Sequence, residues 1–162
     1  MASEIKVDTI VNAGGDNDTG IDLATNDQIL LKVANATRLT MNSTGQTTIV
    51  GEGGTTTTNL QQGLAKCWID YTSASSYTTN DSFNVSSLSD EGTGLGQTNI
   101  SNDMANINYS MTQGCKGGAA NGTKIFQNGD KSVGSFQLYT TNRDGGAFDI
   151  ANTMATVHGD LA

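Results

Sequence analysis

The chain has 162 residues, of which 35% are hydrophobic, 6% aromatic and 15% charged, and it contains 20 Gly, two Cys and no Pro. Its formal net charge of -8 argues against an unaided nucleic-acid-binding protein, because such binding depends mostly on attraction to phosphates. Apolar runs such as residues 29–31 are far shorter than the roughly 20 residues of a membrane-spanning helix. Residues 1–6 do not read as a secretory signal, so we expect assembly in the cytoplasm without membrane insertion.

The composition favours strands over helices. Gly, Asn, Asp and Ser recur every few residues, and these residues disfavour helix interiors and build turns. Thr is common, and it is well suited to strands. The sequence therefore predicts an all-β chain of short strands joined by turns.

Residues 1–50 contain small apolar clusters separated by turn-forming runs such as 12–20 and 42–45. Residues 4–8 and 38–42 alternate between apolar and polar side chains, which is typical of half-buried strands. Leu23, Leu31 and Leu39 follow one another at intervals of eight residues, and Ile49 follows at ten. These intervals form a weak internal repeat of short strands.

A single copy of this ribbon has too little apolar area to offset an ordering entropy of about 1–2 kcal/mol per residue. We therefore expect identical copies, most simply three, to assemble in parallel as a thin stem over residues 1–50. The expected core of that trimeric stem is Ile5, Val7, Leu23, Leu31, Leu39 and Ile49. The alternative is that these strands pack onto the C-terminal half as one sheet of a monomer.

Residues 51–63 are nearly free of apolar side chains and are predicted to be a linker. From residue 64 onward, alternating segments separated by turns predict an antiparallel β-sandwich, the knob, over residues 64–162. These segments include residues 65–71, 82–88, 105–111, 135–140, 147–150 and 154–158. The expected core consists of Trp68, Phe83, Val85, Tyr109, Phe136, Leu138 and Phe148, with Phe126 and Tyr139 as further aromatic members.

Four segments carry a resemblance to a known family: residues 2–10 (ASEIKVDTI), 39–45 (LTMNSTG), 65–71 (AKCWIDY) and 81–94 (DSFNVSSLSDEGTG). They resemble the tail-fibre-like structural proteins of marine bacteriophages, chiefly those of cyanobacteria and similar hosts. The family pattern is similar to A-K-A-W-V-N-F, then S-F-N-V-S-S-I-T-D-N-G-T-G, then a turn like A-M-P-D-A-N-Y. Here Cys67 replaces an Ala, and residues 104–109 replace the turn without its proline.

The resemblance implies a non-enzymatic virion protein on the particle surface, with a slender N-terminal stem and a β-rich knob, assembled as a homotrimer. We expect a short tail fibre whose N-terminus attaches to other virion proteins and whose knob contacts the host surface or a neighbouring fibre. The alternative is a capsid decoration or head-fibre protein without a role in host recognition. No cofactor is expected.

Catalytic and metal-binding motifs are weak. A triad could be sought only around His158, the one histidine, with Asp149 or Asp160 as its carboxylate partner. Cys67 reads as a buried strand residue and Cys115 as a turn residue, and reduced thiols are expected. Asp16, Asp18, Gly20, Asp22 and Asp27 match a calcium-loop template, but Ile21 stands where Gly is required, so a solvated turn is the preferred reading. Residues 92–96 (GTGLG) are predicted to form a hairpin.

Three predicted loops of the knob are rich in Ser, Thr, Asn, Gly and Tyr, namely residues 72–80, 114–124 and 142–146. This mixture makes adaptable polar contacts at low entropy cost. The loops are therefore candidates for contact with a host surface glycan, although the same composition also suits loops that are merely solvated.

Overall fold

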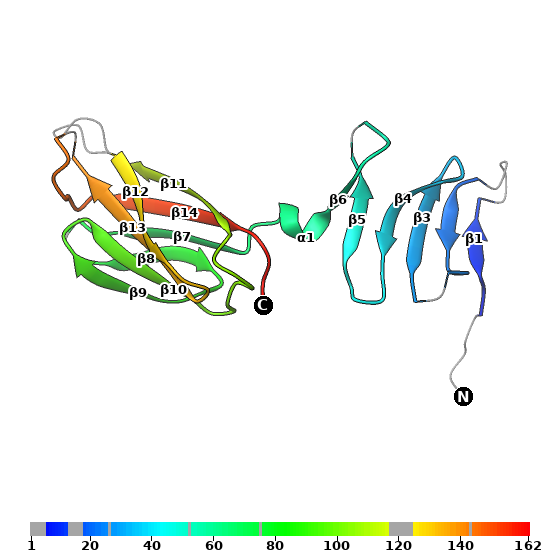
Figure 1. The fold of residues 1–162 in the computed structure, drawn as a ribbon, viewed down its shortest axis with the longest axis horizontal. Helices are drawn as coiled ribbons and strands as arrows, with labels where there is room; N and C mark the ends of the chain where they lie inside the picture. The colour runs from blue at the N-terminus through cyan, green and yellow to red at the C-terminus, as the bar shows by residue number, and fades with distance from the viewer. Residues whose placement is uncertain are drawn as a thin grey trace. The chain divides into compact units, whose positions relative to one another are not determined.

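The computed structural model describes residues 6–12, 18–25, 27–51, 53–74, 76–116, 125–142 and 144–162. The chain is all-β, as its composition predicts, and it forms two compact units, Met1–Gly63 and Leu64–Ala162 (Figure 1). Within the described ranges the helix α1 (Leu60–Gly63) is a single turn, and no helix is long and apolar enough to cross a membrane.

The N-terminal unit is one antiparallel sheet in which each strand pairs with the next along the chain. Its strands are β1 (Thr9–Val11), β2 (Gly20–Asp22), β3 (Ile29–Val33), β4 (Ala36–Met41), β5 (Thr47–Val50) and β6 (Thr57–Asn59). Ala34 and Asn35 join β3 to β4 with φ angles of 53° and 58°, the left-handed pair that a two-residue hairpin needs to match the strand twist.

Two sequence expectations for this unit are corrected. Residues 57–63 are not an extended linker, because β6 pairs with β5 and α1 follows directly. The strand expected over residues 4–8 is absent from residues 6–8, and the first strand begins at Thr9. Residues 4 and 5 lie outside the described residues.

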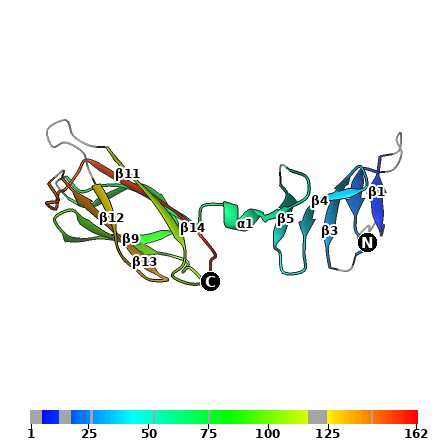
Figure 2. The ribbon, with the colours of Figure 1, turned by 45° about the horizontal axis from the view of Figure 1, so that its top comes forward.

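The C-terminal unit contains two antiparallel sheets of four strands each, in the orders β12-β13-β10-β9 and β11-β14-β7-β8 (Figure 2). The strands are β7 (Cys67–Thr72), β8 (Thr78–Phe83), β9 (Val85–Gly92), β10 (Leu95–Ile100), β11 (Ser110–Lys116), β12 (Ile125–Lys131), β13 (Ser135–Thr141) and β14 (Asn152–His158). Asn84 separates β8 from β9 and is the point at which the chain leaves one sheet for the other.

One core fills the space between the two sheets. Phe136 and Leu138 of β13 are fully buried, and from the other sheet Ile69, Tyr71 and Val157 are at most 1% exposed. Residues between the strands close the core, since Met104 and Tyr109 are 1% and 4% exposed. Because both sheets contribute to a single buried cluster, this unit satisfies the two-layer requirement of a stable domain by itself.

Several aromatic residues expected in this core lie outside it. Strand β7 buries Cys67, Ile69 and Tyr71, and the period of two therefore turns Trp68 to the outer face, where it is half-buried. Phe83 is paired with Trp68 across the strands and is 54% exposed, so its assignment to the core is wrong. The side chains of Phe148, Tyr139 and Val85 are half-buried, and Val85 packs against the core. The side chain of Phe126 lies outside the described residues.

Three predicted segments also differ from the structure. Residues 105–109 form a loop, in which the Asn106 side chain accepts a hydrogen bond from the Asn108 amide, and β11 begins only at Ser110. Residues 147–150 form no strand, although Ala147 makes an isolated bridge to Thr141. Residues 114–116 belong to β11 and not to a turn, because they pair with β14.

Burial of ionisable groups predicts that this unit loses stability in alkali. Burial raises the pKa of Tyr71 and of Tyr109 to about 12 from 10.0, and that of Cys67 to about 11 from 9.0. Below pH 9 the folded and unfolded chains both keep these protons. Between pH 9 and 12 the unfolded chain releases them first, so the free energy of unfolding falls as pH rises. Denaturant titrations followed by Trp68 fluorescence should show this fall, and it should be shallower in Tyr71→Phe. An unchanged midpoint up to pH 11 would contradict the expectation.

Candidate functional site

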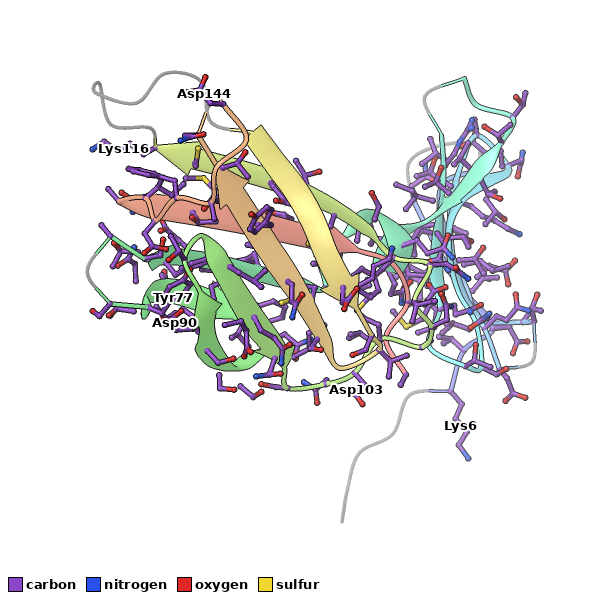
Figure 3. The ribbon with its side chains drawn as sticks, turned by 60° about the vertical axis from the view of Figure 1, so that its left-hand side comes forward. Lys6, Tyr77, Asp90, Asp103, Lys116 and Asp144 are labelled. Atoms are coloured by element: carbon purple, nitrogen blue, oxygen red, sulfur yellow. The ribbon has the colours of Figure 1, made fainter. Side chains whose placement is uncertain are left out.

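The loops of the C-terminal unit gather at the end opposite to Asn84. Because β7–β14 alternate in direction, the described connections after β7 (73–74 and 76–77), β9 (93–94) and β13 (142 and 144–151) all lie at the same end of the two sheets. We call these connections the loop end. Figure 3 places Tyr77, Asp90, Lys116 and Asp144 toward this end of the unit, whereas Asp103 lies at the other. The order of the strands thus brings together two of the three loops that composition singled out.

The structure shortens the first two of those predicted loops. Residues 78–80 of the first belong to β8, and residues 114–116 of the second belong to β11. Residues 117–124 lie outside the described residues. The third, 142–146, is a loop as predicted, apart from residue 143, which is not described.

Asp149 connects three segments of the loop end. Its Oδ1 accepts a hydrogen bond of 2.6 Å from the Gly94 amide and one of 3.3 Å from the Tyr77 hydroxyl. The Tyr77 hydroxyl also lies 3.2 Å from the carbonyl oxygen of Gly92. Burial first, and then the negative charge of Asp149, raise the pKa of Tyr77, so this phenol stays a neutral donor. Sequence reasoning considered Asp149 only as a triad partner and missed this role.

Tyr77 also closes the core beneath the loop end. Its ring stacks on Tyr71 with centroids 5.8 Å apart and planes inclined by 26°. A Cβ on Gly96 would lie 2.7 Å from Cε1 of Tyr77, so glycine is required for the ring to approach β10 so closely. The loop end therefore rests on a packed aromatic pair.

The loop after β13 is held by its own first residue. The Oδ1 atom of Asn142 accepts hydrogen bonds from the amides of Asp144 and Gly146, at 3.0 and 2.8 Å, and Gly145 has a φ of 84°. The same arrangement occurs in the β4–β5 loop, where Asn42 Oδ1 accepts from the amides of Thr44 and Gln46. An Asn with Gly three residues later is a sequence signal that could have predicted both loop geometries.

His158 and Asp149 are not arranged as the histidine and carboxylate of a catalytic triad. Asp149 precedes β14 and His158 is its last residue, so the two lie at opposite ends of a seven-residue strand. His158 pairs with Ser110 in the sheet, and Asp160 is exposed. The triad considered with Asp149 is therefore not formed.

Two of the predicted calcium-loop positions, Gly20 and Asp22, belong to strand β2 and make sheet contacts. Asp22 forms an ion pair with Lys32, and the hydrogen bond from Lys32 lowers the pKa of the Asp22 carboxyl. Gly20 pairs with Val11 in the sheet, and Asp16 lies outside the described residues. The described ranges contain no group of three or more His, Cys, Asp or Glu side chains that could hold a metal ion. Cys67 and Cys115 are both free thiols.

A second candidate site is the surface of the N-terminal sheet. Cross-strand pairing aligns one residue from each of its six strands into a row that we call the central row: Ile10, Ile21, Leu31, Leu39, Ile49 and Thr58. The adjacent row, which faces the other side of the sheet, is mostly polar: Thr9, Asp22, Leu30, Thr40, Thr48 and Asn59. The sheet is therefore amphipathic.

The described residues of this unit form no second layer over the apolar side of the sheet. Among its described residues only Thr47 is buried, whereas Ile10 is 53% and Leu31 38% exposed. Ile29 and Met41, which pair on the same face, are also more than 40% exposed. A half-exposed Leu or Ile leaves on the order of 1 kcal/mol of burial free energy unrealised. An apolar face of this extent is typical of an interaction surface.

The structure brings together half of the residues predicted for the stem core. Leu31, Leu39 and Ile49 share the central row, while Leu23 follows β2 and is 38% exposed. Val7 precedes β1 and is 44% exposed, and Ile5 lies outside the described residues. Sequence reasoning missed Ile10 and Ile21 as members of this row, because the repeat was counted from Leu23 through Leu31 and Leu39 to Ile49.

Comparisons with models of protein families, with curated proteins and with solved structures gave no match.

Proposed function

We propose that this chain is a non-enzymatic bacteriophage virion protein, a short homotrimeric tail fibre. Its N-terminal unit attaches to the particle and joins the three copies. Its C-terminal unit contacts the host surface or a neighbouring fibre. The observation that carries the proposal is the central row, an aliphatic surface on a one-layer sheet that the described residues of its own unit leave uncovered.

The contrast between the two units supports a structural role. The C-terminal unit has its own buried core, whereas the described residues of the N-terminal unit hold one buried side chain, Thr47. A single-layer sheet is stable only when another layer covers its apolar face. In the proposed assembly, the N-terminal units of several copies pack together as a shared shaft. Each C-terminal unit folds on its own as a separate head.

The resemblance of residues 65–71 and 81–94 to tail-fibre-like proteins supports the virion assignment. Residues 81–94 run from β8 through the Asn84 corner and along β9 to the turn at Gly94. The resemblance thus covers positions that connect the two sheets of the C-terminal unit.

The loop end is the proposed contact surface for the host. It presents the exposed residues 74, 76 and 144–146, including the carboxylate of Asp144, together with the exposed carboxylate of Asp90. Uncharged sugar hydroxyls are suitable ligands for such groups, and the hydrogen bonds of Asp149 and Asn142 hold the loops in place before binding. A host surface glycan is therefore the proposed partner.

Deletion of residues 1–63 provides the test. We expect the fragment 64–162 to stay folded, because its core is complete, and to lose attachment to phage particles. Full attachment of the fragment would overturn the proposed role of the N-terminal unit. Quantifying the copies of the full chain per particle tests the location: a small multiple set by the tail symmetry supports a fibre, whereas a number that follows the capsid lattice supports a head decoration.

A further inference from the structure

We infer that an arginine side chain of a partner protein binds on the outer face of the sheet β11-β14-β7-β8, at its β7–β8 edge. The site consists of Trp68 and Asp70 of β7 with Asp81 and Phe83 of β8, and we call these four residues the edge patch. The edge patch is a part of the sheet face and not of the loop end. The inference therefore goes beyond the proposed function and does not depend on it.

Cross-strand pairing places the four side chains next to one another. Trp68 is directly opposite Phe83, and Asp70 is directly opposite Asp81. The residues of β7 on either side of Trp68 and Asp70 are buried in the core, so the four members of the edge patch point to the outer face. Directly opposite residues have their Cβ atoms about 5 Å apart, so an aromatic pair adjoins a carboxylate pair.

The edge patch is accessible to a partner. Phe83 is 54% exposed, Asp81 is exposed, and Trp68 and Asp70 are half-buried. Strand β8 ends the order of its sheet, so a ligand can approach from the side as well as from the front. Aromatic side chains that remain exposed beside polar groups are typical of interaction surfaces.

The two carboxylates favour a cationic ligand. Asp70 accepts hydrogen bonds from the side-chain amides of Asn80 and Asn152, at 2.9 and 3.3 Å. Asp81 accepts one from the backbone amide of Ser82 at 2.8 Å. These donors are neutral, and like charges directly opposite across two strands repel each other, so a bound cation would relieve the repulsion. The C-terminal unit contains nine acidic and five basic residues, and its field also attracts a cation.

The row that contains the carboxylates supplies no cation of its own. Across the four strands it consists of Asp81, Asp70, Met154 and Gly114. Lys116 belongs to β11, at the opposite edge of the sheet from β8. Lys66 precedes β7 and is 8% exposed. The positive charge opposite the carboxylate pair is therefore left for a partner to provide.

Arginine is the side chain that uses both halves of the edge patch. Its planar guanidinium stacks on aromatic faces and donates two parallel hydrogen bonds to a carboxylate. The aromatic pair and the carboxylate pair are two residues apart along their strands, which corresponds to about 7 Å. A guanidinium that binds a carboxylate of this pair therefore lies within reach of the neighbouring ring. Lysine carries the same charge but has no planar group to stack.

The first test uses Trp68 as the reporter, because it is the one tryptophan of the chain. The full chain is titrated with the blocked peptide Gly-Arg-Gly-Arg-Gly, and with the same peptide carrying Lys in place of Arg. We expect the arginine peptide to change the Trp68 emission and to bind about fivefold more tightly than the lysine peptide. Equal affinities would overturn the preference for arginine. No change up to about 10 mM arginine peptide would overturn the site.

The second test compares Asp81→Asn with Asp90→Asn. Both carboxylates are exposed, and each accepts a hydrogen bond from a nearby backbone amide that an Asn side chain can also accept. Asp90 belongs to β9 in the other sheet, so the two variants remove the same charge from different faces. Asp81→Asn should raise the Kd of the arginine peptide about fivefold, and Asp90→Asn less than about twofold. Equal increases would show attraction by net charge alone and would overturn the site.

The third test removes the exposed ring. Phe83→Ala is compared with Ile107→Ala, because the two side chains are 54% and 53% exposed and neither truncation opens the core. Phe83→Ala should weaken binding of the arginine peptide about threefold, and Ile107→Ala should leave it unchanged. Urea titrations of both variants check that the fold is retained. Wild-type affinity in a folded Phe83→Ala variant would overturn the stacking contact.

Two other ligands are distinguished by the same reporter. Maltohexaose, a neutral oligosaccharide, should leave the Trp68 emission unchanged. A change with maltohexaose and none with the arginine peptide would identify a sugar platform and overturn the proposal. An emission that shifts with chain concentration alone would identify a second copy as the occupant and would also overturn it.

Discussion

Gly94→Ala is expected to lower the free energy of unfolding of the C-terminal unit by about 3 kcal/mol or more. Gly94 has a φ of 72°, a conformation that costs a non-glycine residue about 1–2 kcal/mol. A Cβ at this position would also lie 2.4 Å from the carbonyl oxygen of Thr140 and 2.7 Å from the amide nitrogen of Phe148. Both are backbone atoms that cannot rotate away, so the turn must shift and break the hydrogen bond from the Gly94 amide to Asp149.

Gly145→Ala is the matched control. Gly145 has a similar φ of 84°, but nothing lies within 4 Å of a Cβ built there. It should therefore cost only the backbone term, about 1–2 kcal/mol. Urea titrations followed by Trp68 fluorescence give both values. Equal losses in the two variants would show that the close approach at Gly94 contributes nothing.

Asn84→Ala should lower the free energy of unfolding of the same unit by about 2–3 kcal/mol. Its side chain donates to the carbonyl oxygens of Lys66 and Asn102, at 2.9 and 3.1 Å, and accepts from the Asn102 amide at 2.8 Å. Each such hydrogen bond contributes about 0.5–1.5 kcal/mol. The φ of 59° at Asn84 adds a conformational cost for alanine.

Asn84→Gly separates these two contributions. Glycine adopts the positive φ without steric penalty but makes none of the side-chain hydrogen bonds. We expect its stability to lie between that of the wild type and that of Asn84→Ala. Wild-type stability in Asn84→Gly, measured by the same urea titration, would refute the role of the hydrogen bonds at this corner.

The fold class could be predicted from the sequence because it depends on local properties. Turn-forming residues at short intervals and alternating segments such as 67–71 need no knowledge of distant contacts. The same alternation does not say which side of a strand is buried. In β7 the aromatic Trp68 suggested the wrong side, whereas Ile69 and Tyr71 are the residues that the strand buries in the core.

The loop end could be predicted only in part, because its contacts are distant in sequence. Composition marked residues 142–146, and their loop geometry follows from Asn142 and Gly145. The contact of Asp149 with Gly94 spans 55 residues and depends on the order of strands in two sheets. Nothing in the residues around either position indicates that order.

The central row could be predicted from the sequence only as a list of residues, and not as an aligned row. Its members could be listed from apolar periodicity, but their alignment depends on the register of each hairpin, including the irregularity between Leu31 and Lys32. A slip of one residue in a single strand would move its aliphatic side chain to the polar face. The short left-handed turn at Ala34 and Asn35 fixes one of these registers, and its sequence is not the Asn-Gly pair that would have predicted it.

Sequential pairing in the N-terminal sheet also gives the protein a simple means of changing its length. Every described strand of this sheet pairs only with its neighbours in sequence, so a duplicated hairpin inserted between two strands would extend the sheet by two strand spacings, about 10 Å. The eight-residue interval between Leu31 and Leu39 separates the two strands of one hairpin, so such a duplication would leave a repeat of about twice that interval. The length of the N-terminal sheet can therefore change in discrete steps while the C-terminal unit stays the same.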